Sequence, residues 1–492
     1  MKVIADLQIH SKYSRAVSQE MVIPKIWEWA KRKGIALMAT GDWTHPLWMR
    51  EIKANLEETG RGLLKLKDQK WEVARLPARQ GGGKLDKEVS SEKLEYDPLF
   101  LLATEVSCIY SQGGKLRRIH TLIWAPSIES AEKINKELIN RGANLVSDGR
   151  PIVGLTSIAI AELVFSIDPT CLIIPAHCWT PWFSLYGSES GFDSIDECFG
   201  NFAKYIYAIE TGLSSDPAMN WRIKELDNRS IVSFSDAHSG PKLGREATVF
   251  DLSELSYKAI RAALVRPAIQ TLNKGPRTES RSIEAKPKSK NQELIESNKI
   301  DYTVEFYPEE GKYHYTGHRN CGVKQDPSET RKNGTICPVC GRKLTVGVMH
   351  RVDELAGRTE EELEIKKMEI KGVQMEGIGS KKFYQRPPYM MMVPLQEILA
   401  EVLKTSTHSQ AVQNEYGKLL DNLGSEFEIL LSTATSDITR ISGPEISGAI
   451  GKVRDGQLTI DPGYDGVFGK VKIFSEKSHE EEEKKKEQLS LF

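Results

Sequence analysis

VIADLQIH, residues 3–10, is the stretch of the chain on which the predicted fold depends. Apolar and polar residues alternate along it, which predicts a β-strand with one buried face and one polar face. The polar face carries Asp6, Gln8 and His10. The strand therefore brings side chains of the kinds that bind metal ions toward its C-terminal end.

Strands and helices continue to alternate after this strand as far as about residue 272. The helix predicted at 22–34 has Pro24 in its first turn and Gly34 just beyond its end, as helices commonly do. This alternation predicts an α/β domain, residues 1–272, with a parallel sheet or a barrel. Further apolar strands are predicted at 35–43, 98–106, 117–126, 170–179, 204–212 and 229–238.

The composition excludes several classes of protein. The 492 residues are enough for about three domains, and 39% of them are hydrophobic, which fits a globular protein with a real core. No apolar run has the length of a membrane span, and the N-terminus resembles no secretion leader, so we expect a cytoplasmic, nucleoid-associated protein without a membrane partner. The formal net charge of −1 excludes nucleic-acid binding by bulk charge but leaves room for a local basic groove.

Changes in composition predict the boundaries of the other segments. Residues 55–97 are polar and basic, which indicates a mobile insertion in the first domain. Residues 273–300 are rich in Lys, Ser and Pro, as linkers are. The remaining segments are a cysteine-containing module at 301–352, a helical and mixed region at 353–474, a charged linker at 475–487 and a terminal peptide at 488–492.

Candidate metal ligands follow the predicted strands of the first domain at or near their C-terminal ends. In α/β barrels the active site lies at that end, because the loops after the strands converge there. Any one such histidine is more often an ordinary core or loop residue, but several in one domain indicate a joint site. Imidazole and carboxylate together suit zinc or manganese, and clustered ions promote displacement at phosphorus, so the pattern predicts phosphoester hydrolysis. The candidates are Asp42, His45, Glu105, His120, His177, Asp236 and His238.

The motifs ADLQIHSKYS, ATGDWTHP, LLATEVS, RIHTLI, IPAHCW and SFSDAHS together resemble the polymerase-and-histidinol-phosphatase (PHP) family of phosphoesterases. The resemblance implies a distorted (β/α)7 barrel with two or three metal ions. It also implies that His10, Glu105 and Asp236 hold one ion. A second ion would lie between His120, His177 and a bridging Glu105, and His238 would serve a third.

The sequence departs from the family pattern at three places. Gln8 stands where a histidine is usual, and Arg15 stands where an acid is expected. The usual Thr-Asp-His is Gly41-Asp42-Trp43, so the third site either uses His45 or is empty. Arg15 has two interpretations, a catalytic contact to phosphate or a surface salt bridge.

His318, Cys321, Cys337 and Cys340 form two short-spaced pairs, His-x2-Cys and Cys-x2-Cys. Thiolates and imidazole at this spacing are typical of a structural zinc site. His314 is an alternative to His318. A module of about fifty residues has little core, so we expect the ion to hold it folded.

KYHYTGHRNCG, CPVCGRKLTVG and the helical part that follows resemble endonuclease Q, from residue 1 to about 400. The resemblance implies a metal-dependent endonuclease that nicks DNA 5′ to uracil, hypoxanthine, xanthine or abasic sites, with Asp236 and Glu105 catalytic and Zn²⁺, Mg²⁺ or Mn²⁺ as the working ion. Cationic and aromatic residues suited to DNA contact follow the zinc module: Lys381, Lys382, Phe383, Tyr384 and Arg386.

The C-terminal residues Gln488, Leu489, Leu491 and Phe492 resemble the peptide by which bacterial repair proteins bind the sliding clamp. Apolar anchors on a charged, solvated leash indicate a partner, although a tail packed on its own domain is an alternative. We therefore predict a clamp-associated DNA repair endonuclease. The rivals are a small-molecule phosphoesterase of the histidinol-phosphatase kind and a non-catalytic clamp-bound scaffold.

Overall fold

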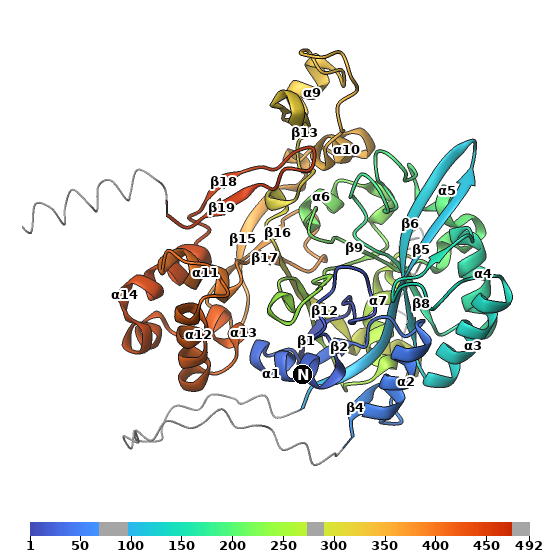
Figure 1. The fold of residues 1–492 in the computed structure, drawn as a ribbon, viewed down its shortest axis with the longest axis horizontal. Helices are drawn as coiled ribbons and strands as arrows, with labels where there is room; N and C mark the ends of the chain where they lie inside the picture. Colours follow the sequence, from blue (N-terminus) through green and yellow to red (C-terminus); the bar gives the residue numbers. More distant parts are fainter. Residues whose placement is uncertain (68–96, 273–289, 475–492) are drawn as a thin grey trace, which may run out of the picture.

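The structure is a computed structural model that describes residues 1–67, 97–272 and 290–474 (Figure 1). Its N-terminal part is built on three parallel strands, β1 (Lys2–Asp6), β2 (Leu37–Ala39) and β5 (Leu99–Gln112). The strand predicted at 3–10 is present as β1, and its extension is joined by a bridge between Ile9 and Ala237. The chain has the mixed α/β architecture that the alternating pattern predicts.

The predicted alternation of strands and helices is interrupted at β5 and β6 (Lys115–Ala125), which follow one another directly as a long antiparallel hairpin. Gln112 pairs with Lys115, so the connection is only Gly113 and Gly114. Both glycines have positive φ, 61° and 73°, which is the backbone of a type I′ turn and matches the twist of a hairpin. The two glycines therefore reverse the chain directly, without the connecting helix that two parallel strands would need.

Hydrogen bonds join β1, β2, β5, β6 and three further strands into a ring of seven. The strand β8 (Leu172–Pro175) pairs antiparallel with β6, and β9 (Ala208–Glu210) pairs parallel with β10 (Ser230–Val232). Cys178 N–H donates to Glu210 O (3.1 Å), which links the end of β8 to β9, and His10 N–H donates to Ala237 O (3.0 Å), which links the chain after β10 to β1. The side chains that follow β1, β8 and β10 are thereby directed to one place.

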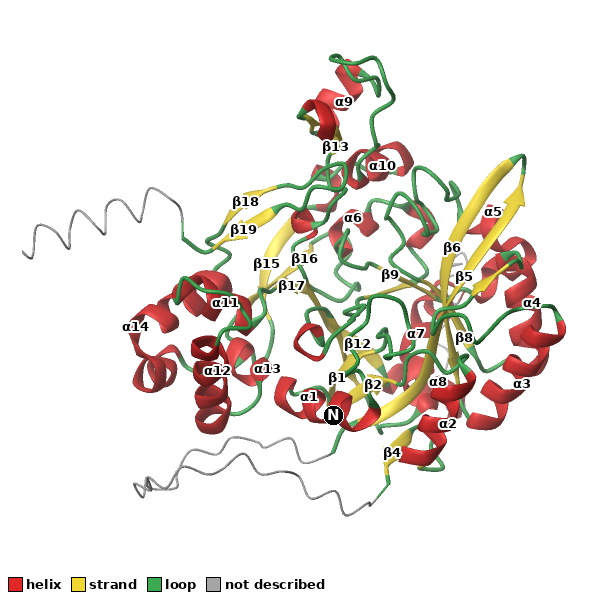
Figure 2. Ribbon diagram, viewed as in Figure 1, coloured by secondary structure: helices red, strands yellow, loops and turns green. Residues whose placement is uncertain are grey.

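Helices cover the outside of these strands (Figure 2). The apolar face of α1 is buried at Ile23, Ile26 and Ala30, and Gly34 ends the helix in the left-handed conformation with φ 85°. The helices of this part are α1 (Ile23–Lys33), α2 (Pro46–Asn55), α3 (Ile128–Asn140), α4 (Ser157–Ile167), α5 (Ile195–Phe199), α6 (Pro217–Trp221) and α7 (Tyr257–Leu272).

The main sheet continues beyond the first predicted domain. The strand β11 (Ala247–Asp251) pairs with β1, β12 (Lys299–Glu305) pairs with β11, and β17 (Tyr389–Met391) pairs with β12. The predicted start of the cysteine-containing module at residue 301 therefore falls inside a strand of this sheet. The change in composition does not mark the end of the sheet, because the sheet is held together by contacts between distant segments. The outer strands are β15 (Ile365–Glu369) and β16 (Glu376–Ser380).

Parts of the predicted insertion and linker are regular structure. Within the predicted insertion, β3 (Leu56–Glu58) and β4 (Leu64–Leu66) form a hairpin that pairs with β5, and residues 68–96 lie outside the described residues. The predicted linker contains α8 (Lys290–Ser297) and the start of β12, and its residues 273–289 are likewise outside the described part. A two-residue strand, β7 (Ile152–Val153), also joins β5.

The module with the clustered cysteines projects from the rest of the molecule (Figure 1). It contains β13 (Thr316–His318), β14 (Val323–Gln325), α9 (Pro327–Asn333) and α10 (Val348–Leu355). A C-terminal hairpin of β18 (Thr459–Asp461) and β19 (Lys470–Lys472) reaches back to it, where Tyr315 N–H donates to Gly463 O (2.9 Å). The module is therefore supported by contacts with the C-terminal hairpin, which is distant from it in the sequence.

Four helices make up most of the region between β17 and that hairpin, in agreement with the predicted helical character. They are α11 (Leu395–Val402), α12 (Gln410–Leu423), α13 (Glu426–Leu431) and α14 (Thr435–Arg454), the last kinked at Gly443. Among the described residues, none of the helices has the length and apolar composition that crossing a bilayer requires.

Candidate metal centre

The structure brings six of the predicted ligands into two groups at one end of the strand ring. Ligand atoms of His10, Asp236 and His238 lie within 4.8 Å of one another, and so do those of Glu105, His120 and His177. His10, His177 and Asp236 come from loops just after β1, β8 and β10, while Glu105 and His120 lie inside β5 and β6. Three of the six ligands therefore follow strand ends, as expected for a barrel, and two strand residues, Glu105 and His120, meet them from within the long hairpin.

Glu105 connects the two groups through its two carboxylate oxygens. Its Oε2 lies 3.2 Å from His10 Nε2, and its Oε1 contacts His120 Nδ1 and lies 3.5 Å from His177 Nε2. Asp236 Oδ1 lies 3.1 Å from the same His10 nitrogen. One carboxylate facing two sets of donors has the geometry of a bridging ligand.

Two of the six clustered ligand candidates occupy unfavourable backbone conformations. His177 has φ 30° and Asp236 has φ 46°, a region that residues other than glycine rarely adopt. Gly212 (φ 60°) passes so close to His177 that a Cβ on it would lie 2.4 Å from the His177 Cβ. Strain of this kind persists only where the surrounding structure holds it, and it concentrates at functional sites.

The charges of the cluster depend on one another. Burial alone would lower the pKa of His10, but the charge of Asp42 and the adjacent carboxylates of Asp236 and Glu105 raise it well above its ordinary value. Burial opposes ionisation of Asp236, yet His10 holds the pKa of that carboxyl below its usual range. Burial lowers the pKa of His120 to about 4, so its imidazole is neutral, as a metal ligand must be.

The residues present fit bound cations. Glu105 Oε1 and Asp236 Oδ1 are buried and have no hydrogen-bond donor in good geometry among the described residues. Together with the imidazole nitrogens of the histidines they form the mixed oxygen and nitrogen donor set that zinc or manganese accepts. Buried carboxylates in this number need positive charge near them, and ions between the two groups would supply it.

Three residues beside the cluster support its ligands: the predicted candidate Asp42, and Gln8 and Arg150, which were not predicted as ligands. Asp42 accepts hydrogen bonds from the Ser11 N–H (2.6 Å) and Ser14 Oγ (2.9 Å), and its Oδ1 lies 3.0 Å from His10 Nδ1, which orients that ring. Gln8 Nε2 donates to Glu105 Oε2 (2.9 Å). Arg150 Nη1 lies 3.6 Å from Glu105 Oε1, and nothing in its local sequence, SDGRP, indicated this role.

Two predicted site residues lie apart from the two groups. His45 precedes the first residue of α2 and stacks on Tyr13 at 4.4 Å between ring centroids, and among the described residues it belongs to neither group. The third-site ligand His238 instead lies beside His10, with its ring centroid 4.9 Å away. Arg15 is exposed on the loop after Ser14.

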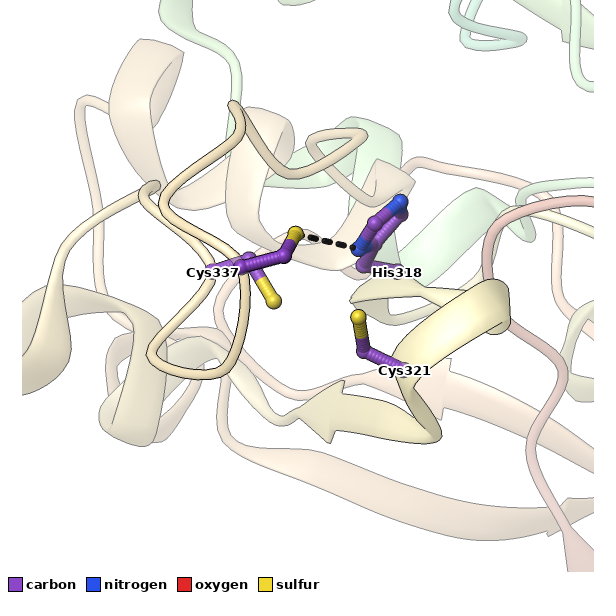
Figure 3. Close-up of side chains that lie close together, drawn as sticks. His318, Cys321 and Cys337 are labelled. Atoms are coloured by element: carbon purple, nitrogen blue, oxygen red, sulfur yellow. Dashed lines mark hydrogen bonds between the residues drawn. The ribbon is translucent and has the colours of Figure 1, made fainter.

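The second cluster consists of His318, Cys321, Cys337 and Cys340, whose ligand atoms lie within 4.8 Å of one another. Figure 3 labels the first three of these residues, whose side chains point toward one another. Burial opposes ionisation of Cys337, but the backbone N–H of Cys340 and the His318 ring lower the pKa of its thiol to about 6. The left-handed Gly341 (φ 71°) turns the chain so that its N–H donates to Cys337 O (2.9 Å). His318 joins the thiols, and the alternative His314 is not in this group.

The segment predicted to contact DNA is the turn between β16 and β17. Lys381, Lys382 and Tyr384 are exposed there, Tyr384 by 74%. Arg386 is engaged within the fold, since it pairs with Asp227 (3.1 Å). The Phe383 ring is partly buried, with the Arg358 guanidinium 4.6 Å from its centroid. The predicted charged linker and clamp-binding peptide, 475–492, lie outside the described residues.

Comparison with known proteins gives matches to the whole chain and to one part of it. The family described as the MJ0043 C-terminal domain matches residues 394–457, which are helices α11 to α14. The uncharacterized protein MJ0043 of Methanocaldococcus jannaschii is 29% identical over 303 residues, 61% of this chain but only 32% of that protein. The uncharacterized protein YqxK of Bacillus subtilis is 26% identical over 480 residues, 96% of this chain and 99% of YqxK.

Two of the solved structures that match are endonucleases. The lesion-specific endonuclease PfuEndoQ from Pyrococcus furiosus superposes with a TM-score of 0.72 at 29% identity, over 97% of this chain and 96% of that chain. Endonuclease Q in complex with a 27-mer duplex carrying an abasic lesion at the active site superposes with a TM-score of 0.71 at 29% identity, over 97% and 98% of the two chains. The chain is thus similar to endonuclease Q along nearly its whole length.

Proposed function

We propose that this protein is a metal-dependent DNA repair endonuclease that nicks one strand on the 5′ side of a deaminated base or an abasic site. The observation that carries the proposal is the similarity, over 97% of the chain, to endonuclease Q bound to a duplex with an abasic lesion at its active site. The geometry supports it, because imidazoles and carboxylates from distant segments share one end of a barrel-like ring of strands, as in the PHP type of phosphoesterase.

The residues of the centre have separate tasks in this reaction. Divalent ions held by the two groups would polarise the phosphodiester and make water a better nucleophile. Glu105 presents one oxygen to each group, and His120 and His177 complete the group to which Glu105 itself belongs. Asp236, whose side chain is 22% exposed, lies where it can orient the attacking water. The guanidinium of Arg150 is suited to pair with a phosphate oxygen, and the exposed Arg15 is a second candidate for that contact.

The other predicted parts serve binding in this proposal. Zinc held by His318, Cys321, Cys337 and Cys340 keeps the projecting module folded. Lys381, Lys382 and Tyr384 contact the DNA backbone or a base from the turn before β17, while Arg386 and Phe383 support that turn. Residues 488–492 tether the enzyme to a bacterial sliding clamp.

The experiment uses end-labelled duplexes with a single abasic site, uracil or hypoxanthine, and an intact duplex as control. Each is incubated with the protein in EDTA, Mg²⁺, Mn²⁺ or Zn²⁺, and the cut position is mapped. We expect a nick 5′ to the lesion that leaves a 3′-hydroxyl, only in the lesion strand and only with a divalent ion. Nicking of the intact duplex at an equal rate, or no nicking with any ion, would contradict the proposal.

The same preparation separates the rival functions. A histidinol-phosphatase-like enzyme would release phosphate from small phosphomonoesters and leave every duplex intact. A scaffold would hold the zinc of the four-residue cluster and no further ion. Metal analysis of the purified chain therefore tests the scaffold, and a phosphate-release assay tests the phosphatase.

A further inference from the structure

Glu210, at the end of β9, is a buried acid to which the proposed reaction gives no task. Its side chain is fully buried, and its Oε2 accepts a hydrogen bond from the His177 N–H (2.8 Å). Its other oxygen, Oε1, has no hydrogen-bond partner among the described residues. Burying a carboxyl costs free energy that a single hydrogen bond to a neutral N–H compensates only in part. Within the described part of the chain, this carboxyl makes its hydrogen bond to the backbone of a candidate metal ligand.

The backbone of that ligand needs support. His177 has φ 30°, in the left-handed region that residues other than glycine rarely adopt. Glu210 holds two consecutive N–H groups here, because its main-chain O also accepts the Cys178 N–H (3.1 Å). Gly212, two residues further along, has no side chain to keep the two segments apart. The end of β9 therefore lies directly against His177 and fixes its backbone.

The ring of His177 is held less firmly on its second nitrogen than the ring of His10. The Nδ1 of His177 lies 3.5 Å from Thr180 Oγ1, which is at the limit of a hydrogen bond. The Nδ1 of His10 lies 3.0 Å from Asp42, and that carboxylate orients the ring directly. Ligand histidines are usually oriented by a partner on the second ring nitrogen. Where that partner is distant, the direction of the ring depends on the backbone, which Glu210 holds.

We propose that Glu210 is a positioning residue of the metal centre, which acts through the backbone of His177 and sets how tightly the group around Glu105 holds its ion. The left-handed backbone at His177 brings its Nε2 to 3.5 Å from Glu105 Oε1. Release of the N–H would let His177 relax to a favoured conformation and turn its ring away from the other ligands. The inference rests on the proposed endonuclease function and adds a residue that controls ion binding at that site.

Glu210→Gln and Glu210→Met separate the hydrogen bond from the charge. Glutamine keeps an oxygen that accepts the His177 N–H, whereas methionine has a similar length and no oxygen. Mn²⁺ binding is followed by electron paramagnetic resonance, in which the signal of the free ion disappears on binding, with chains that retain the zinc of the four-residue cluster. We expect Glu210→Met to weaken Mn²⁺ binding about 10- to 100-fold, the usual effect of losing a residue that orients a ligand, and Glu210→Gln to weaken it less than about threefold.

Nicking of the abasic duplex gives a second readout. For Glu210→Met we expect a higher Mn²⁺ concentration at the half-maximal rate, but a maximal rate within about threefold of that of the unaltered chain, since saturating ion fills the weakened site. A merely structural role would lower the melting temperature and leave Mn²⁺ binding by the folded chain unchanged.

Glu246→Met is the matched control. Glu246 is also fully buried, its Oε1 accepts the Phe306 N–H (3.2 Å), and its Oε2 has no hydrogen-bond partner among the described residues. Phe306 is not a candidate ligand, so Mn²⁺ binding by this variant should be unchanged even where its melting temperature falls.

Equal weakening of Mn²⁺ binding by Glu210→Gln and Glu210→Met would overturn the inference, because the charge of Glu210 would then act on the ion itself. Unchanged binding by both would overturn it as well. If Glu210→Met does not fold, Glu210→Asp replaces it, since a carboxyl one methylene shorter falls short of the His177 N–H and should also weaken binding. The binding measurement needs no DNA, so failure of the unaltered chain to nick any duplex would reject the proposed function and leave this comparison to decide the inference.

Discussion

Asp236 is the residue on which the proposed chemistry depends most directly. It lies 3.1 Å from His10 Nε2 at a backbone φ of 46°, which asparagine tolerates better than most residues. We therefore expect Asp236→Asn to keep the fold and the melting temperature but to lower the nicking rate by at least about a hundredfold, since one charged metal ligand is lost. The rate is measured under single turnover with saturating Mn²⁺.

Asp251→Asn is the matched control for that change. Asp251 is a partly exposed carboxylate on β11. It lies opposite Lys2 at the start of β1, far from the metal centre at the other end of that strand, and pairs with Lys2 at 3.0 Å. Its loss should leave the rate unchanged, because a surface ion pair contributes little. Substantial nicking by Asp236→Asn would remove Asp236 from the reaction.

Gly212→Ala tests whether the close approach of the chain to His177 matters. The new Cβ would lie 2.4 Å from the His177 Cβ, so we expect weaker metal retention and a loss of stability above the ~1 kcal/mol that a left-handed alanine costs. Gly113→Ala separates the two effects, because Gly113 has nearly the same φ (61°) and nothing within 4 Å. Equal effects of both variants on metal content would show that only backbone strain is involved.

At the scale of elements, the zinc module is expected to depend on its ion. Its strands β13 and β14 have three residues each, too short to hold a fold by their own pairing. Chelation should release one zinc per chain and make the three cluster thiols reactive toward a thiol reagent. The other four cysteines are buried, and burial raises the pKa of each of their thiols, so they should stay unreactive and serve as the internal control. Reaction of the cluster thiols before chelation would argue against a bound ion.

The strand β12 carries a buried acid that should make stability depend on pH. Burial raises the pKa of Glu305 from 4.5 to about 8, although Ser233 Oγ donates to it (2.5 Å). Its protonated form is favoured in the folded state, so its contribution is complete below pH 4.5 and is lost as pH rises to about 8. Glu305→Gln should melt like the unaltered chain at pH 5 and a few degrees higher at pH 8.5. Identical melting curves at both pH values would contradict this assignment.

At the scale of the whole molecule, a buried ion pair joins the first domain to the C-terminal helices. Lys33 Nζ, at the end of α1, lies 2.8 Å from Glu426 Oε2 on α13, and their side chains are only 2% and 4% exposed. Tyr416 Oη also donates to that carboxylate (2.7 Å). Lys33→Met leaves the carboxylate buried without its cation, so we expect a loss of about 3–5 kcal/mol in the free energy of unfolding, measured with urea.

Lys242→Met is the control at the same boundary. Lys242 pairs with Glu397 of α11 at 2.6 Å, but its side chain is 43% exposed, so the loss should be at most about 1 kcal/mol. Similar losses for the two variants would mean that the burial of the Lys33 pair is not what holds the helices against the first domain.

Much of the candidate site could be predicted because its residues occur at recognisable places in local patterns. His10, His177 and Asp236 follow apolar strands, and strand periodicity is a property of neighbouring residues. Arg150 was not predicted because its partner, Glu105, is far away in the chain. Asp42 was a predicted candidate, but its contacts with His10 and Ser14 appear only in the folded chain. His45 is not in either of the two groups, and its distance from Asp42 in the sequence does not determine where its ring lies.

The sequence by itself determined the strands and helices of the first domain, the spacing of the zinc-type ligands and the residue types at the strand ends, since each depends on contacts within a few residues. Only the tertiary structure decided that β5 and β6 run antiparallel, that β12 continues the first sheet, and that Glu105 faces both histidine groups. These features depend on which distant surfaces bury one another, and the free energy of that burial is a property of the whole packed chain.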